Sequence, residues 1–299
     1  MSGGLDPFEI VDVSSWAPVG PEVRSKRVKV WVDDPDGNRW LRTEPLTQPP
    51  KPNEPAIEAF ALRLARAAGL RAPESYSCEW EDGGSRLRGL VVRSFTERGD
   101  QMQDGAGIVK GTIDGYDPAD KAGHTIARVR VALKALEKRP GAQGLRAAFM
   151  DTVFFDAWIG NGDRHPENWG IIRRSGGGVE FTPLFDMAAC LGVELVDGCL
   201  LLDPINRTGE RLGRYVGDCP SGFGNGKDLI GQSEVVEQIR RWQGWRERAK
   251  ELLVRFERLW DGPIWRYFDT VPPSWFSDER RILAKELLGH RLAWLRSKV

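Results

Sequence analysis

Three polar side chains near the middle of the chain, Asp163, Asn168 and Asp186, have the types and the order that phosphoryl transfer requires. The first two lie five positions apart in a short polar run, GNGDRHPENWG, and the third follows 18 positions later. In this reaction one carboxylate orients the attacking hydroxyl and accepts its proton, while an amide oxygen and a second carboxylate hold Mg²⁺ against the phosphate oxygens. The set therefore predicts a catalytic or nucleotide-metal site.

The elements around this run are predicted to bring the three side chains together. An apolar helix is expected over residues 143–159, with its large side chains spaced for burial, and Gly160 ends it. A hairpin is expected to follow, with strands over residues 168–174 and 179–182. Its second strand leads to Asp186, so the amide and the second carboxylate can converge on one ion.

Each of these residues, taken alone, also has a structural interpretation. Aspartate and asparagine are common in loops because their side chains cap turns and helices. Asn168 could be a turn residue, and Asp163 could cap the loop or pair with Arg164. The order of all three residues after an apolar helix favours the functional interpretation.

Two other motifs are weaker candidates for chemistry. His165 and Glu167 have no helical HExxH pattern and no cysteine partner, so we expect His165 to organise its own loop by hydrogen bonding. The run GFGNGK at residues 222–227 lacks the spacing of a phosphate-binding loop. Because no strand is predicted before it, we interpret this run as an ordinary flexible connection.

The first half of the chain predicts strands with one inserted helix. Alternating valines predict a strand over residues 27–33, and the turn DPDG joins it to a second strand. A helix is expected to begin near Asn53, with Pro55 in its first turn and Gly69 after its end. The strands expected in this half cover residues 27–33, 38–43, 73–80 and 86–95.

The second half predicts mainly helices. Residues 99–118 are rich in glycine and aspartate and show little periodicity, so we expect a linker or a flexible loop there. The expected helices cover residues 124–138, 143–159, 228–242, 245–260 and 278–296.

The overall composition argues against several classes of protein. The 299 residues include 43 Lys plus Arg and 43 Asp plus Glu, so the net charge is zero and we expect no direct binding to nucleic acid. We find no secretory signal and no apolar stretch long enough to cross a bilayer, so we expect no membrane association. The 4 cysteines lack zinc-ligand spacing, which favours a reduced, cytoplasmic protein.

Three stretches of the chain resemble one bacterial family. The run NGDRHPENWG followed by FTPLFDMA is similar to the catalytic and metal-binding loops of HipA-like kinases. The stretch KVWVDDPDGNRWL resembles the glycine-loop hairpin of the family. The helix around Glu58, which ends in AAGLRAP, resembles its regulatory helix. The resemblance spans about residues 10 to 290.

The resemblance implies an α+β fold with the two lobes of a protein kinase, distantly similar to phosphatidylinositol kinases. A small β-rich N-terminal lobe would cover residues 1–98, a linker residues 99–118, and a mainly helical C-terminal lobe residues 119–299. The resemblance also implies ATP and Mg²⁺ as cofactors. The loop of residues 20–29 would lie over the phosphates.

Carried over residue by residue, the resemblance gives each site residue a role. Asp163 would be the catalytic aspartate, and Asn168 and Asp186 would be the Mg²⁺ ligands. Glu58 would be the helix carboxylate that pairs with a phosphate-binding lysine. Backbone groups near Ser94 and Phe95 would contact the adenine.

That lysine is where this sequence departs from the family. The family has it late in the second hairpin strand, where this chain reads WLRTEP and Thr43 takes the aligned position. Arg42 is adjacent, but neighbouring strand residues point to opposite faces, so it would reach the cleft only through a bulge or a register slip. Lys29 on the neighbouring strand and Lys51 in a loop are the other candidates, and the sequence leaves the choice open.

The function that this resemblance implies is an ATP- and Mg²⁺-dependent kinase acting on Ser or Thr of another protein. The missing lysine supports an alternative, a pseudokinase that binds nucleotide with little turnover, and a small-molecule or lipid kinase is a third possibility. Members of the family often act as toxins restrained by a DNA-binding partner. Since this chain shows no helix-turn-helix of its own, such an antitoxin-like partner would be a separate protein.

Overall fold

A six-stranded sheet forms most of the N-terminal part of the protein. The computed structural model describes residues 7–22, 27–45, 51–195 and 210–299. The first strand pairs in parallel with its neighbour, and the other neighbouring strands pair antiparallel. The strand order is β1 (Ile10–Asp12), β5 (Ser75–Asp82), β6 (Ser85–Arg93), β4 (Arg39–Thr43), β3 (Lys29–Asp33) and β2 (Ala17–Pro21). The two predicted strand pairs of this half, β3–β4 and β5–β6, are confirmed.

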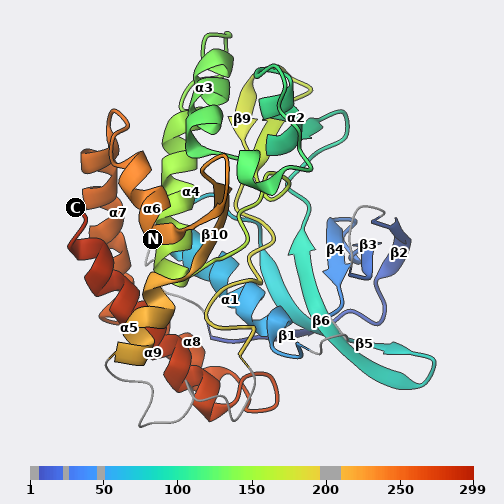
Figure 1. The fold of residues 1–299 in the computed structure, drawn as a ribbon. Coiled ribbons are helices and arrows are strands. Elements are labelled where there is room, and N and C mark those ends of the chain that lie inside the picture. The colour runs from blue at the N-terminus through green and yellow to red at the C-terminus, as the bar shows by residue number, and fades with distance from the viewer. Residues whose placement is uncertain (1–6, 23–26, 46–50, 196–209) are drawn as a thin grey trace.

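The one helix among the described residues of this part, α1 (Glu54–Ala67), was predicted with nearly the observed ends. Asn53 takes the N-cap position, Pro55 lies in the first turn, and Gly69 has a φ of 75°, which a residue without a Cβ adopts at little cost. Eleven of the 14 helix residues are buried. Figure 1 shows α1 between the sheet and the helices of the C-terminal part, so both sides of the helix are covered.

The apolar side chains of α1 pack into the same core as the C-terminal helices. The Phe60 ring lies 5.0 Å from the ring of Tyr267 and 4.7 Å from that of Phe268, both on α8 (Pro263–Thr270). A separate apolar cluster, which includes Trp40, Trp80 and other side chains of the sheet, fills the opposite face of the sheet. The sheet therefore has one face toward α1 and one face away from it.

The helical part is built around α4 (Leu145–Ile159), whose prediction is confirmed. The Trp158 ring of this helix stacks on Phe256 at 4.2 Å, and other helices pack around α4 on the left of Figure 1. The surrounding helices are α3 (Ile126–Leu136), α6 (Gln232–Ile239), α7 (Trp245–Trp260) and α9 (Asp278–Arg296). The bounds predicted for α7 and α9 agree with the structure.

Of the two alternatives expected for residues 99–118, a linker or a flexible loop, the flexible loop is wrong. This segment contains β7 (Gln101–Asp104) and α2 (Gly105–Lys110), and the 3₁₀ helix η1 (Lys121–Gly123) follows it. β7 pairs with β8 (Gly170–Arg173), which pairs in turn with β9 (Val179–Phe181). A Cβ on Gly105 would lie 2.2 Å from the Trp169 ring, so this glycine permits close packing and does not signal a loop.

The interpretation of residues 222–227 as an ordinary connection also needs correction. They belong to a hairpin of β10 (Pro220–Gly224) and β11 (Leu229–Gly231), and a Cβ on Gly224 would lie 2.2 Å from the Ala122 carbonyl oxygen. The helix predicted from residue 228 therefore begins later, at α6. Two short helices were not predicted, α5 (Glu210–Gly217) and α8.

None of the helices in the described ranges has both the length and the hydropathy needed to cross a lipid bilayer.

Candidate active site

The polar run predicted to carry chemistry forms a compact loop after α4. Gly160, with a φ of 70°, ends the helix, and the Asp163 N–H donates to Asn161 Oδ1 at 3.4 Å. The Asn168 side-chain amide donates to the Asp163 carbonyl oxygen at 2.8 Å, which closes the loop on itself. The Asp163 carboxylate is 56% exposed, whereas Asn168 is buried. The loop thus exposes the Asp163 carboxylate to solvent and holds the Asn168 side chain in a fixed position.

Asp186 lies where the N-terminal sheet, α1 and the loop of residues 160–168 meet. Its carboxylate Oδ2 lies 3.6 Å from the Lys29 Nζ of β3. The next backbone N–H, of Met187, donates to Glu58 Oε1 of α1 at 3.2 Å. Asp186 has a φ of 52°, a left-handed conformation that costs a residue with a Cβ about 1–3 kcal/mol and is often found at functional sites.

Two carboxylates at this junction have opposite pKa shifts. Burial, together with the negative charge of Asp186, raises the pKa of Glu58 to about 7, although Lys29 and Arg27 partly counter this rise. Burial would also raise the pKa of Asp186, but the charges of Lys29, Arg27 and other nearby cations hold it below its ordinary value. Of the two carboxylates, Asp186 is therefore the one that stays ionised to lower pH.

The buried Arg164 joins the loop of residues 160–168 to the segment that carries Asp186. Its guanidinium pairs with Asp156 of α4 through two bonds, of 2.8 and 2.9 Å. It also donates to the Asn168 carbonyl oxygen, and to the Phe185 carbonyl oxygen at 3.2 Å. One rigid guanidinium fork thus fixes the backbone next to two of the predicted site residues. The structural interpretation offered Arg164 as a pair for Asp163, whereas the ion-pair partner of this guanidinium is Asp156.

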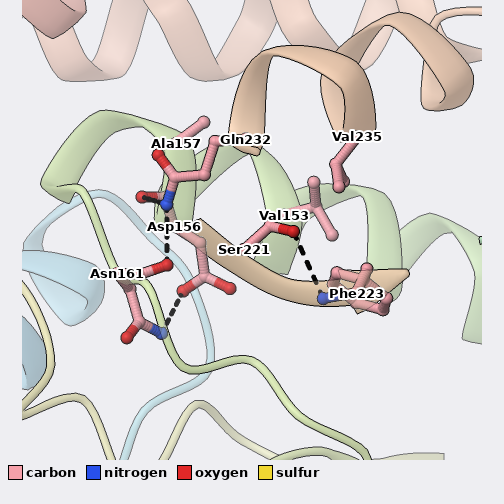
Figure 2. Close-up of a pocket in the computed structure, with 8 residues that line it drawn as sticks. All are labelled: Val153, Asp156, Ala157, Asn161, Ser221, Phe223, Gln232 and Val235. Atoms are coloured by element: carbon pink, nitrogen blue, oxygen red, sulfur yellow. Dashed lines mark hydrogen bonds between the residues drawn. The ribbon is translucent and has the colours of Figure 1, made fainter. Parts of the chain in front are cut away.

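A second polar group, the side chain of Gln232 on α6, also supports the loop, as Figure 2 shows. The Gln232 side-chain amide donates to the backbone oxygens of Asp156 at 3.1 Å and Asn161 at 2.6 Å, and the Asn161 amide donates to Asp156 Oδ1 at 2.9 Å. The cavity beside these residues has a volume of about 10 Å³, close to the minimum for a single water molecule. It therefore belongs to the support of the loop and has no room for a substrate.

His165 has the local role that was predicted for it. Its Nδ1 accepts from the Glu167 N–H at 3.2 Å, and its Nε2 lies 3.8 Å from Asp163 Oδ2. The prediction that this histidine organises its own loop by hydrogen bonding is confirmed.

The register of β3 and β4 determines which candidate cation reaches the site. Lys29 lies directly opposite Thr43 in an unbroken antiparallel ladder, so both lie on the same face of the sheet. Arg42 is on the opposite face, with its guanidinium 4.3 Å from the centre of the Trp80 ring. Lys51 lies 3.7 Å from Glu54. Of these candidates Lys29 contacts Asp186, and the structure does not bring Arg42 to the site.

Ser94 and Phe95 lie on the segment that leads from the sheet to the second half. The Ser94 N–H donates to the Arg39 carbonyl oxygen at 2.9 Å, and the Phe95 carbonyl oxygen accepts from Arg174 at 3.2 Å. The Phe95 ring lies 5.6 Å from the ring of Phe185, which precedes Asp186. The expected adenine contacts of this segment stay a prediction.

The phosphate loop expected over residues 20–29 lies partly outside the described residues, because these omit residues 23–26.

The arrangement of this site agrees with two comparisons. The model of the HipA-like C-terminal domain family matches residues 28–202, more than half of the chain. The chain belongs to this HipA-like family. The solved structure of the proinflammatory kinase CtkA of Helicobacter pylori has the same fold, with a TM-score of 0.75 over 95% of this chain and 94% of that chain. At 17% identity this likeness shows the fold alone. A search of curated proteins gave no significant match.

These findings confirm two predictions, the family and the α+β, kinase-like fold with a β-rich N-terminal part and a helical C-terminal part. Sequence reasoning about this HipA-like chain missed the ion pair of Asp156 and Arg164. A signal was present, since Asp156 is a lone carboxylate in the apolar stretch FFDAWI, and a buried charge needs a partner.

His124 makes the folding of this HipA-like protein sensitive to acid. It is buried, and its Nε2 accepts from the Trp169 Nε1–H at 3.2 Å, one residue after Asn168. Burial, with the nearby His165 as a smaller cause, lowers the pKa of His124 from 6.5 to about 3. The unfolded chain takes up this proton near pH 6.5, whereas the folded chain resists it. The contribution of His124 to stability is therefore complete above pH 6.5 and is lost below it.

We expect the free energy of unfolding to fall by about 1.4 kcal/mol per pH unit between pH 6.5 and 3 from this group alone. Denaturant unfolding across this range measures the slope. His124→Gln keeps an acceptor for Trp169 and removes the titration, so its slope should be shallower by that amount. The exposed His290→Gln serves as the control. Equal slopes for wild type and His124→Gln would contradict the prediction.

Proposed function

We propose that this protein is an ATP- and Mg²⁺-dependent phosphotransferase that phosphorylates Ser or Thr of another protein. The observation that carries the proposal is the junction of Asp163, Asn168 and Asp186. Arg164 bonds the Asn168 and Phe185 carbonyl oxygens, and the Asn168 amide bonds the Asp163 carbonyl oxygen. One connected network thus holds a base, an amide oxygen and a second carboxylate, as phosphoryl transfer requires.

The donor atoms fit a magnesium-nucleotide complex. The Asn168 side-chain nitrogen is used within the loop, so its oxygen is the atom suited to a metal, and the Asp186 carboxylate supplies a second hard oxygen donor. Bound Mg²⁺ would neutralise charge on the phosphate oxygens. Lys29, 3.6 Å from Asp186, supplies the positive charge that the phosphates of ATP require.

In the proposed mechanism each residue of this chain has one task. Asp163 accepts the proton of the acceptor hydroxyl, for which its exposed carboxylate is well placed. Asn168 and Asp186 would hold the metal, and Glu58 fixes the backbone next to Asp186 by accepting from the Met187 N–H. Lys29 binds the phosphates. The cleft would lie between the proposed lobes of residues 1–98 and 119–299, and Ser94 and Phe95 would contact the adenine.

A second candidate function rests on Thr43. The family's lysine is absent from this position, and a kinase without its phosphate cation binds nucleotide with little turnover. The location of Lys29 opposite Thr43 favours the active enzyme, because the ammonium lies on the same face of the sheet.

The experiment that tests the proposal is an assay with γ-labelled ATP and Mg²⁺, with cell protein and cell metabolites as separate acceptors. We expect labelled protein and ADP from wild type, and neither from Asp163→Asn. Label in metabolites alone would replace the protein acceptor with a small molecule. Nucleotide binding without ADP formation would favour the pseudokinase.

The biological setting is proposed on the family resemblance. We propose a protein acceptor and a separate DNA-binding partner that restrains the kinase. The buried free thiols of Cys78, Cys190 and Cys219 support a reducing, cytoplasmic setting.

A further inference from the structure

A second cation, Arg27, contacts α1 at the edge of the site. It lies two residues before Lys29, which is the first residue of β3. Its Nη2 is 3.3 Å from Glu54 Oε1, and its Nη1 is 3.8 Å from Glu58 Oε2. The Arg27 side chain is only 17% exposed, and the two carboxylates are nearly buried. The two ends of one guanidinium thus face two carboxylates of one helix.

The two carboxylates require such a partner. Glu54 and Glu58 are four residues apart, so they lie on the same side of α1 and repel each other. A buried carboxylate is costly unless it is paired. A guanidinium can meet both acids because its donors form a planar fork, whereas a lysine ammonium acts as a point charge. Lys51 adds charge near Glu54, at 3.7 Å, but does not contact Glu58 within ion-pair distance.

Lys29 has a different direct partner. Its Nζ lies 3.6 Å from Asp186, and its charge also acts on Glu58 without a direct ion pair among the described residues. In protein kinases one lysine both pairs with the helix glutamate and contacts the phosphates. In this chain the direct contacts are divided between two cations, since Arg27 touches the helix and Lys29 touches Asp186.

We propose that Arg27 is a positioning residue that holds α1 through Glu54 and Glu58, and that Lys29 is thereby left to bind the nucleotide phosphates. This inference rests on the proposed function for the role of Lys29. Arg27 keeps α1 where Glu58 can bond the Met187 N–H beside Asp186.

The first test of this division of roles between Arg27 and Lys29 measures the stability of the protein without nucleotide. Arg27→Gln is expected to lower the melting temperature by about 5 °C or more, because the buried carboxylates of Glu54 and Glu58 lose the guanidinium that pairs with both of them. In a double-mutant cycle with Glu54→Gln the double variant should lose less than the sum of the single variants. Arg39→Gln, which removes an exposed ion pair with Asp33 on the same hairpin, is the matched control and should shift the melting temperature by about 1 °C or less.

The second test measures binding of a fluorescent ATP analogue. Lys29→Gln should weaken binding by about tenfold or more with a small change in melting temperature, and Arg27→Gln should change affinity by about threefold or less. Arg27→Lys should recover part of the lost stability, since an ammonium can pair with one acid. The inference fails if Arg27→Gln shows no coupling to Glu54→Gln, or if it weakens binding as much as Lys29→Gln does.

These readouts separate the inference from the proposed function. Coupling of Arg27 to Glu54 together with the Lys29 binding defect, in a protein that transfers no phosphate, would overturn the phosphotransferase and support the division of roles. Phosphate transfer without that coupling would overturn the division and support the phosphotransferase.

Discussion

Asp163→Asn is expected to lower kcat for phosphoryl transfer by about 10³-fold while the affinity for nucleotide changes by about threefold or less. The amide has nearly the shape of the carboxylate but cannot accept the proton of the attacking hydroxyl. The loop should keep its form, because the Asn168 amide bonds the Asp163 backbone oxygen and not its side chain. Single-turnover transfer from labelled ATP and titration with a fluorescent ATP analogue measure the two quantities.

A matched control for this substitution is Asp114→Asn, which changes an exposed aspartate that has no part in the proposed site. It should leave both transfer and binding at the wild-type level. If Asp163→Asn keeps more than about a tenth of the wild-type rate, Asp163 is not the base of this reaction.

Lys29→Thr is expected to lower phosphoryl transfer by about 10²-fold, and adding Thr43→Lys to the same chain should recover at least about tenfold of it. The two positions are directly opposite in the β3–β4 ladder and share the face toward the site. Side chains at such positions lie about 5 Å apart, so a lysine on either strand can reach the same phosphates. The measurement is the rate of labelled phosphate transfer, with a thermal melt of each variant to verify folding.

The control for this exchange is Lys29→Thr combined with Arg42→Lys. Position 42 is adjacent to Thr43 but lies on the face that packs against Trp80, so this lysine should restore nothing. Equal recovery by both double variants would show that charge in the general region suffices, and that strand register does not select the phosphate cation.

Long periodic elements with clear ends could be predicted from the sequence. Helix α1 has a proline in its first turn and a glycine after its end, and α7 and α9 have many turns of amphipathic pattern. The segment of residues 99–118 could not be predicted, because β7 and α2 are too short for periodicity to show. Its glycines suggested a loop, whereas Gly105 is needed for contact with Trp169, a residue distant in sequence.

The compact polar loop of residues 160–168 could be predicted because its residues are close together in the chain. The cation at Asp186 could not be selected, since the choice between Lys29, Arg42 and Lys51 depends on strand register and on which face each side chain takes. The role of Arg27 was missed for a related reason. Its partners lie on α1, 27 residues away or more, and no local pattern shows that contact.

The measurement that tests the central claim most directly is ATP-dependent uptake of Mn²⁺, used in place of Mg²⁺ and followed by electron paramagnetic resonance. If Asn168 and Asp186 hold one nucleotide-bound metal, wild type and Asp163→Asn should both take up Mn²⁺ when ATP is present, while Asn168→Ala and Asp186→Asn should not. Unchanged ATP-dependent uptake by Asn168→Ala and Asp186→Asn would contradict the assignment of this site.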